Sequence, residues 1–459
     1  MPAWKWFVKN FMRFGDRLSG HNMFSRLDFL EKVQWWNQEQ IREYQQQTLQ
    51  SLIAVAYNEV PFYRQLMDDS KIKPEEIRKP SDLRKLPILT KDVIRSNYPG
   101  KITRDTGHKT YESRTSGSTG KNFCVLEDYA TAGWYRASFL LALEWAGWII
   151  GDPHLQTGMT LDRSFDKKLK DWFLRCYYVS AFDISDEKLD SSLELLRKNK
   201  IKHLWGYPGS IFFLARRALQ KGWDQPLQSV VTWGDNLYPQ YRKTIEKAFN
   251  TKVYDTYGCA EGIQISAQCG CGSTYHIHGL DTIVEFLDDH GNPAADNEQG
   301  NIILTRLYPG PMPLIRYKVG DIGIHGLKRK CECGRGFDLM ESIQGRDTDI
   351  VITPSGNRLI VHFFTGIFEF FDEIDSFQVV QETIDSIVVR IKPKGNFFKQ
   401  TAEQVIAALR QKGADLKIEI EIVSEIPLAA TGKRTFVISK LGSVYKQQDA
   451  PAAEVQKRK

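Results

Sequence analysis

A short stretch of hydroxyl, glycine and basic residues, TSGSTGKN at 115–122, has a composition suited to binding phosphate. Glycine lets the backbone approach a ligand closely, and successive main-chain N–H groups and hydroxyls can then surround an anion. Lys121 adds a point charge. The stretch is not a Walker A loop, because Gly117 and Gly120 are too close and Asn122 replaces the hydroxyl. By itself it predicts either a phosphate-binding loop or a flexible Ser/Gly surface turn.

Two Cys-x-Cys pairs, at 269–271 and 331–333, and a His-x-His pair at 276–278 form a second group that could carry chemistry. Thiolates and imidazoles in sets of four are the preferred shell of zinc, and a closed set implies a structural site. Cys-x-Cys is less diagnostic than Cys-x-x-Cys, so spacing alone leaves metal binding and unrelated cysteines equally open. In a reducing compartment paired cysteines favour a metal over a disulfide.

Composition excludes several classes of protein. Hydrophobic residues at 42% and charged residues at 26% are ordinary for a soluble globular chain. The net charge of +6 is mild, and the basic residues are dispersed, which argues against nucleic acid as the main partner. The sequence has no apolar window of transmembrane length and no signal-peptide pattern, so we expect a cytoplasmic protein.

The first 18 residues have a helical period within an amphipathic N-terminal region that we place at 1–34. One face is apolar and largely aromatic, with Trp4, Phe7, Phe11, Phe14 and Leu18, and the opposite face carries Lys5, Lys9, Arg13 and Arg17. Such a helix suits peripheral contact with anionic lipid at the inner face of a membrane. The alternative is a helix docked on the protein's own surface with its charges solvated.

Strand-like and helical segments alternate through the middle of the chain. We expect strands at 123–126, 202–205, 229–233 and 252–254, and helices at 129–148, 206–219 and 238–249. This alternation predicts an α/β layer structure with a largely parallel sheet. Ligands bind where parallel strands end in loops, so the strand ends at Gly206, Gly234 and Gly258 are expected to form one wall of a pocket.

The 459 residues predict two or three domains. We expect an α/β protein with a large multi-layer domain at 35–346 and a small, mobile α+β domain at 347–445. The large domain would begin with a helix-rich module and include antiparallel strands at 283–287, 300–307 and 314–317. The small domain would contain helices at 362–371 and 401–411 with strands at 376–381, 385–392 and 416–423, and a disordered tail would follow at 446–459.

Five motifs occur in a characteristic order: TSGSTGK at 115–121, YGCAE at 257–261, PLIRYKVGD at 313–321, Gly345-Arg346 with Asp349, and TGK at 431–433. This order resembles the adenylate-forming superfamily of acyl-CoA synthetases, luciferases and adenylation domains. More narrowly the chain is similar to the phenylacetate–CoA ligase branch with its relatives from capsular polysaccharide gene clusters, and the VPFY segment at 60–63 shares that similarity.

The resemblance implies that the protein activates a carboxylic acid with ATP and Mg²⁺, forms an acyl-adenylate, and passes the acyl group to CoA or to an amine of a sugar or amino acid. The expected ATP-binding residues are Thr115, Ser116, Gly117, Ser118, Thr119, Gly120, Lys121, Gly234, Asp235, Tyr257, Gly258 and Asp321. Within this set the loop at 116–121 would hold the β- and γ-phosphates and Tyr257 would stack on adenine. Asp321 would accept hydrogen bonds from both ribose hydroxyls.

The expected catalytic residues are Lys433, Arg346 and Glu261. By resemblance, Lys433 bridges the substrate carboxylate and the α-phosphate, Arg346 lies near the ribose or α-phosphate, and Glu261 holds Mg²⁺. The expected acid-binding residues are Tyr207, Pro208 and Trp233. Two positions depart from the family pattern: Thr348 replaces the aspartate that commonly forms the interdomain hinge, and Asp235 replaces a glutamate.

Several members of the same branch have a similar Cys/His set, so the resemblance favours structural zinc in a subdomain at about 259–340. We expect Cys331 and Cys333 as ligands with His276 and either Cys269 or Cys271, and a set of four cysteines is the alternative. A non-catalytic, zinc-stabilised binding protein on this fold is the other functional hypothesis. The presence of Lys121, Glu261, Asp321 and Lys433 argues against it.

Overall fold

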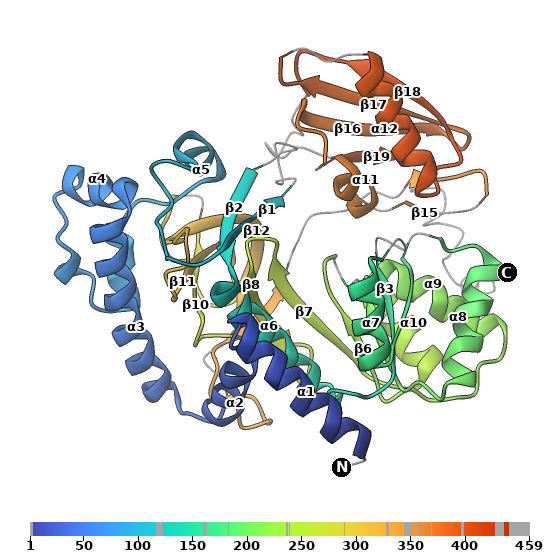
Figure 1. Cartoon of the computed structure of the whole chain (residues 1–459), viewed down its shortest axis with the longest axis horizontal. Coiled ribbons are helices and arrows are strands. Elements are labelled where there is room, and N and C mark those ends of the chain that lie inside the picture. The colour runs from blue at the N-terminus through green and yellow to red at the C-terminus, as the bar shows by residue number, and fades with distance from the viewer. Residues whose placement is uncertain are drawn as a thin grey trace, which may run out of the picture.

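The protein is described here by a computed structural model over residues 3–115, 123–158, 163–181, 183–235, 237, 239–288, 290–326, 330–343, 351–355, 358–359, 361–368, 370–395, 399–426 and 436–439. An 11-stranded sheet in the order β10-β11-β12-β13-β9-β8-β7-β6-β5-β3-β4 forms its centre (Figure 1). One half of this sheet is parallel and the other half is antiparallel.

In the described residues the parallel half has five strands, of which the alternating pattern predicted three, at 202–205, 229–233 and 252–254; the strand predicted at 123–126 lies instead in a separate two-stranded sheet. The parallel half contains β3 (His154–Gly158), β4 (Cys176–Ser180), β5 (His203–Gly206), β6 (Ser229–Thr232) and β7 (Val253–Cys259). The helices between them are α7 (Phe165–Leu174), α8 (Asp186–Lys198), α9 (Pro208–Gln220) and α10 (Pro239–Phe249). Every residue of β5 and β6 is buried, as expected for parallel strands covered on both faces. The predicted α/β class is confirmed.

The antiparallel half continues the same sheet, because β7 pairs with β8 in the antiparallel sense. It contains β8 (Ile263–Gln268), β9 (Tyr275–Ile277), β10 (Thr282–Leu287), β11 (Gln299–Arg306), β12 (Tyr317–His325) and β13 (Leu339–Ile343). The strand predicted at 314–317 is wrong in position, since β12 begins at Tyr317. The chain turns at Arg316, which has a left-handed backbone with φ of 52°. Its guanidinium donates hydrogen bonds to the carbonyl oxygen of Leu86 and to the carboxylate of Glu285, and these bonds hold the turn.

The chain before β3 forms a series of helices and one β-hairpin. The helices are α1 (Ala3–Ser19), α2 (Met23–Val33), α3 (Gln38–Glu59), α4 (Pro61–Asp69), α5 (Lys91–Asn97) and α6 (Tyr129–Trp145), with short 3₁₀ turns at Pro74–Glu76 and Pro80–Lys85. Strands β1 (Thr110–Thr115) and β2 (Phe123–Asp128) form the hairpin. Among the described residues no helix combines the length and apolar content needed to cross a bilayer.

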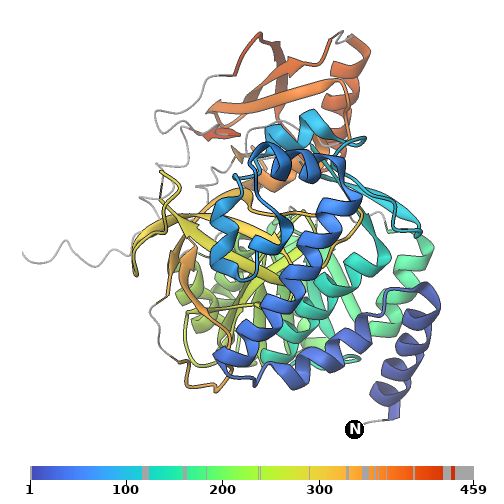
Figure 2. The same ribbon diagram turned by 90° about the vertical axis from the view of Figure 1, so that its left-hand side faces the viewer.

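The C-terminal part is a small α+β unit with its own core. Strands β16 (Ile374–Thr383), β17 (Ser386–Pro393), β18 (Lys417–Ile422) and β19 (Val437–Ser439) form a sheet in the order β18-β17-β16-β19. Helices α11 (Val361–Phe368) and α12 (Lys399–Gln411) and the pair β14 (Val351–Ile352) and β15 (Arg358–Leu359) complete it. In both views it lies at the top of the molecule, over the large sheet (Figures 1 and 2).

Candidate active site and metal centre

The carboxyl ends of β5, β6 and β7 lie side by side in the sheet, as the sequence predicted. Gly206, which ends β5, has φ of 150°, and a Cβ there would lie 1.8 Å from Thr157 Oγ1. Gly234, just beyond β6, has φ of 78°, and its Cβ would lie 2.8 Å from the ring of Tyr207. Both positions require glycine, because each combines a left-handed backbone with a close neighbour. The glycines therefore let Thr157 and Tyr207 pack directly on the strand ends.

The residues expected to bind the acid lie around these strand ends. Pro208 is buried at the first position of α9, where its fixed φ suits a helix start. Tyr207 lies one residue earlier and packs against the hydrophobic core of the C-terminal unit. The ring of Trp233 meets that of Phe139 edge to face, at a centroid distance of 5.5 Å. Phe139 had no sequence signal, because nothing separates it from the other apolar residues of α6.

Tyr257 and Asp321, expected to contact adenine and ribose, are brought together from strands that are not neighbours in the sheet. The hydroxyl of Tyr257 on β7 donates a hydrogen bond of 2.8 Å to Oδ2 of Asp321 on β12. Both residues are partly exposed. A carboxylate has two oxygens and can accept this bond together with bonds from a vicinal diol. The pair can therefore recognise the sugar and base of a nucleoside at one place.

Glu261 lies in the turn between β7 and β8 and is only 3% exposed. Its Oε1 accepts a hydrogen bond from the hydroxyl of Tyr317 and lies 4.0 Å from Nζ of Lys91. A buried carboxylate is costly without such partners, so these two groups stabilise its charge. Tyr317 lies within the PLIRYKVGD motif, which could have marked it. Lys91 had no sequence signal.

A buried ion pair between Arg306 and Glu127 contacts the turn that carries Glu261. Arg306 is fully buried, and its Nη1 lies 3.3 Å from Oε1 of Glu127 and donates to the carbonyl oxygen of Glu261 at 3.3 Å. Burial raises the pKa of Glu127, and Arg306 opposes that shift. Burial also raises the pKa of the Cys259 thiol well above its usual value. Cys259 also packs against the main hydrophobic core.

Part of the expected ATP site lies outside the described residues. These positions are Ser116, Gly117, Ser118, Thr119, Gly120, Lys121, Arg346 and Lys433, together with Thr348 and Asp349. The described strands bracket the loop, because Thr115 at the end of β1 is paired with Phe123 at the start of β2. Of the remaining expected ATP-binding residues, Gly258 is exposed and Asp235 partly exposed, each at the carboxyl end of a parallel strand.

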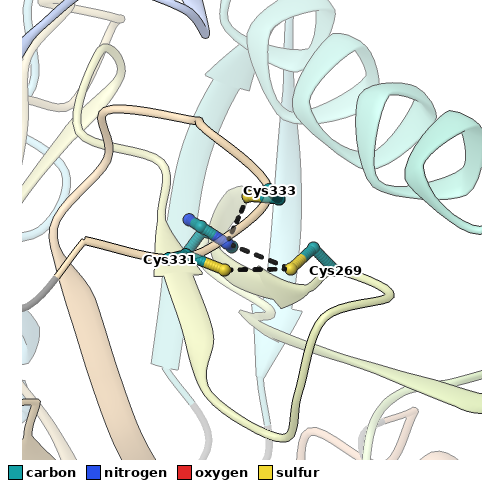
Figure 3. A group of neighbouring side chains, drawn as sticks. Cys269, Cys331 and Cys333 are labelled. Atoms are coloured by element: carbon teal, nitrogen blue, oxygen red, sulfur yellow. Dashed lines mark hydrogen bonds between the residues drawn. The ribbon is translucent and has the colours of Figure 1, made fainter.

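Four cysteine and histidine side chains converge at the edge of β8 and β9. His276 Nε2 lies 3.3 Å from Cys269 Sγ and 3.4 Å from Cys333 Sγ, and Cys269 Sγ lies 3.5 Å from Cys331 Sγ. All four candidate ligand atoms lie within 4.8 Å of one another. Figure 3 shows the three thiols directed toward a common point. We call this set of Cys269, His276, Cys331 and Cys333 the metal cluster.

The donor set fits zinc. With Zn–S bonds of about 2.3 Å and tetrahedral geometry, ligand atoms lie roughly 3.5–3.8 Å apart, close to the three separations of 3.3 to 3.5 Å given above. Burial lowers the pKa of His276 to about 4, and Arg335 adds to the effect, so the imidazole is neutral and can bind a metal. Three thiols and one imidazole make a closed set of four, which is the arrangement of structural zinc sites.

Cys271 lies outside the metal cluster, so the geometry favours three cysteines and one histidine over the alternative of four cysteines. Its side chain is exposed, and its backbone N–H, not its thiol, is directed to Cys269 Sγ at 3.5 Å. Residues two apart share a face within a strand, but β8 ends at Gln268, so Cys269 and Cys271 lie in the turn beyond it and only Cys269 joins the metal cluster. His278 also lies outside the metal cluster, and its ring is stacked on that of Trp145 at a centroid distance of 5.4 Å.

The loop that carries Cys331 and Cys333 is attached to the N-terminal helices. Arg335 Nε donates to Oε1 of Gln34 at 2.8 Å, and its guanidinium lies 4.6 Å from the ring centroid of Trp145. A metal bound to the cluster would therefore join the sheet, this loop, α2 and α6 into one packed region.

Comparison with known proteins agrees with this fold. Residues 351–440 match the family model of the CapK C-terminal domain. The chain is 24% identical over 390 residues to phenylacetate-coenzyme A ligase of Thermus thermophilus, covering 80% of this chain and 85% of that protein. It is 25% identical over 403 residues to Protein CapK of Staphylococcus aureus, covering 83% and 85%. Crystal structures of 2-hydroxyisobutyryl-CoA ligase in the postadenylation state share the fold, one with TM-score 0.58 and 16% identity over 90% of this chain and 93% of that chain.

Proposed function

Because the chain is a member of the adenylate-forming superfamily, in its phenylacetate–CoA ligase and CapK-like branch, we propose that it activates a carboxylic acid with ATP and transfers the acyl group to CoA. The observation that carries the proposal is the hydrogen bond of 2.8 Å between Tyr257 and Asp321. This bond joins two strands at the edge where the parallel strands end, and it suits a nucleoside with its ribose against the carboxylate.

The first half-reaction joins the acid to AMP. A carboxylate oxygen of the acid attacks the α-phosphorus of ATP, and the bond from that phosphorus to the bridging oxygen breaks as pyrophosphate leaves. Lys433 and Arg346 would hold the negative charge that develops at the α-phosphate, and the loop at 116–121 would hold the leaving group. Mg²⁺ would neutralise phosphate charge, with Glu261 as its protein ligand. Lys91 and Tyr317 keep the Glu261 carboxylate in position.

The second half-reaction transfers the acyl group. The sulfur of CoA attacks the acyl carbon, AMP leaves, and the thiol proton passes to solvent. Pro208 and Trp233 at the strand ends, with Phe139 against the Trp233 ring, supply an apolar environment for the acid, and Tyr207 links this region to the C-terminal core. An aromatic wall of this kind excludes water, which would otherwise hydrolyse the adenylate.

The second candidate acceptor is an amine of a sugar or amino acid, which would give an amide. Residues 351–440 match the CapK C-terminal domain, and we expect this small unit to close over the acceptor. The match therefore supports an amine acceptor as the alternative to CoA. We propose in either case that zinc occupies the metal cluster as a structural ion, since four protein ligands leave no position open for a substrate.

Exchange of labelled pyrophosphate into ATP tests the proposal. We expect exchange only when the correct acid is present, and we expect Lys433→Ala to abolish it. Lys417→Ala, a change at an exposed lysine on β18, is the matched control and should leave exchange intact. Mass spectrometry with CoA and then with amino sugars distinguishes a thioester from an amide. ATP binding without exchange on a broad panel of acids would instead favour a non-catalytic binding protein.

A further inference from the structure

Exposed apolar side chains are concentrated on two helices that are far apart in the sequence. Eight of the sixteen large hydrophobic residues that are exposed in the described part of the chain lie on α1 and α7. Their exposed fractions run from 47% to 82%. We call this surface the aromatic face; it consists of Trp6, Phe7, Phe11, Phe14 and Leu18 of α1 and Phe165, Leu169 and Trp172 of α7. Contiguous exposed apolar patches on soluble proteins mark sites of interaction.

Ring contacts join the two helices into one surface. Trp4 meets Trp172 edge to face at 5.7 Å and is stacked with Phe173 at 6.4 Å. Phe173 is also stacked with Phe11 at 5.2 Å, and Phe11 is stacked with Phe7 at 6.1 Å. The residues between the two groups are therefore packed aromatic rings, and the aromatic face is continuous across α1 and α7.

The fold leaves most of this face exposed, because other side chains also attach α1 to the protein. Helix α1 is attached through Val8, which is fully buried, and through Asp16, whose Oδ2 accepts the backbone N–H of Phe24 at 3.0 Å. Ion pairs of Lys5 with Asp152 and of Arg13 with Asp28 hold the helix at its sides. Within its apolar stripe, the rings of Trp4 and Phe11 pack on α7, while Phe14 and Leu18 are 63% and 75% exposed.

We propose that the aromatic face docks the protein on the surface of a bilayer that contains anionic lipid. Tryptophan and phenylalanine on one side of a helix, with basic residues beside them, are typical of helices that lie in the interfacial plane. Both helices also carry exposed cations, with Arg17 on α1 and Lys167 and Lys168 on α7. These charges complement anionic headgroups. A second copy docked through the same face would bring like charges together, which disfavours dimerisation as the use of this surface.

Flotation of the full-length protein with lipid vesicles tests the proposal. We expect binding to vesicles of phosphatidylcholine with phosphatidylglycerol, weaker binding to phosphatidylcholine alone, and loss of binding as salt is raised. The triple variant Phe7→Ser/Phe11→Ser/Phe14→Ser and the double variant Phe165→Ser/Trp172→Ser should each reduce binding at least about 10-fold. These side chains are about half exposed or more, so the variants should stay folded, with a small fall in melting temperature from the lost ring contacts of Phe11 and Trp172.

The matched control is Ile384→Ser/Ile422→Ser/Phe370→Ser, which removes three exposed apolar side chains from the C-terminal unit. It should bind vesicles like the wild type. The proposal is overturned if wild-type protein does not float with anionic vesicles, if it binds neutral vesicles equally well, or if the control loses as much binding as the triple variant. A dimer in solution that the triple variant converts to monomer, without vesicle binding, would assign the face to a second copy instead. None of these readouts depends on ligase activity.

Discussion

Two buried polar sites on the antiparallel half of the sheet differ in what their side chains face. In the metal cluster, four donors from β8, β9 and the loop before β13 converge on one another within 4.8 Å. At Glu261, a single carboxylate is balanced by the hydroxyl of Tyr317 and the ammonium of Lys91. The first site is closed and complete once a metal is present. The second keeps one carboxylate beside the strand ends where the nucleotide is expected.

Burial has different consequences for stability and for chemistry at these two sites. A closed ligand set converts metal-binding free energy into folding free energy, so its loss should be felt as instability. A carboxylate held by a cation and a hydroxyl is stable without a further ligand, so its charge remains for chemistry. Stability and activity should therefore be separable by mutation at the two sites.

Removing the metal should have the largest effect. Cys331→Ser leaves three ligands, and we expect it to lower the free energy of unfolding by about 4 kcal/mol or more. Cys271→Ser changes an exposed thiol outside the metal cluster and should stay within about 0.5 kcal/mol of wild type. Denaturation monitored by circular dichroism, together with zinc content per chain, measures both. Equal losses in the two variants, or a zinc-free protein with normal stability, would contradict the assignment.

Glu261→Gln should have the opposite effect to Cys331→Ser, with loss of activity and little loss of stability. The amide keeps the size of the side chain and an oxygen for Tyr317 but loses the charge for Mg²⁺, so we expect pyrophosphate exchange to fall about 10²- to 10³-fold with little change in melting temperature. The matched control is Glu285→Gln, because Glu285 pairs with Arg316 at 3.1 Å. This control should lose stability and keep its exchange rate. The comparison fails if Glu261→Gln unfolds the protein or exchanges normally.

Asp281 is a third buried polar group, with neither metal nor cation, and should give the smallest effect. It is 1% exposed, its Oδ2 accepts a hydrogen bond of 2.6 Å from Ser138, and its Oδ1 has no partner in the described part of the chain. Burial raises its pKa to about 8. An unfolded aspartate has a pKa of about 3.9, so between about pH 4 and pH 8 only the folded state keeps the proton. We therefore expect the contribution of Asp281 to the free energy of unfolding to fall as pH rises through this window.

Asp281→Asn removes that titration. Its stability relative to wild type should rise by about 1.4 kcal/mol for each pH unit between about pH 5.5 and pH 7.5. Urea denaturation at the two pH values checks the slope. Asp288→Asn is the control. A hydrogen bond from the backbone N–H of Asn292 is the main cause that lowers the pKa of Asp288 below its usual value. We therefore expect no slope for this variant between about pH 5.5 and pH 7.5. A flat difference for Asp281→Asn would show that the carboxyl is ionised in the folded state.

Sequence alone determined the α/β class, most of the strands, and the residue types available for chemistry. Hydrophobic period is a property of neighbours along the chain, so the strands at 203–206, 229–232 and 253–259 were placed within a few residues. The order of the motifs is also a property of the linear sequence, and it identified the superfamily. The start of β12 was missed because the left-handed turn at Arg316 is held by Leu86 and Glu285, which lie far away in the sequence.

Tertiary structure decided which of these residues meet. The choice of Cys269 over Cys271 depends on the direction of one turn at the end of β8, and Lys91 reaches Glu261 only because α5 packs beside the hairpin and sheet. The amphipathic pattern of residues 1–18 predicted a helix, but not which face would be docked. Distances between segments far apart in the chain settle such questions, and a linear pattern contains no information about those distances.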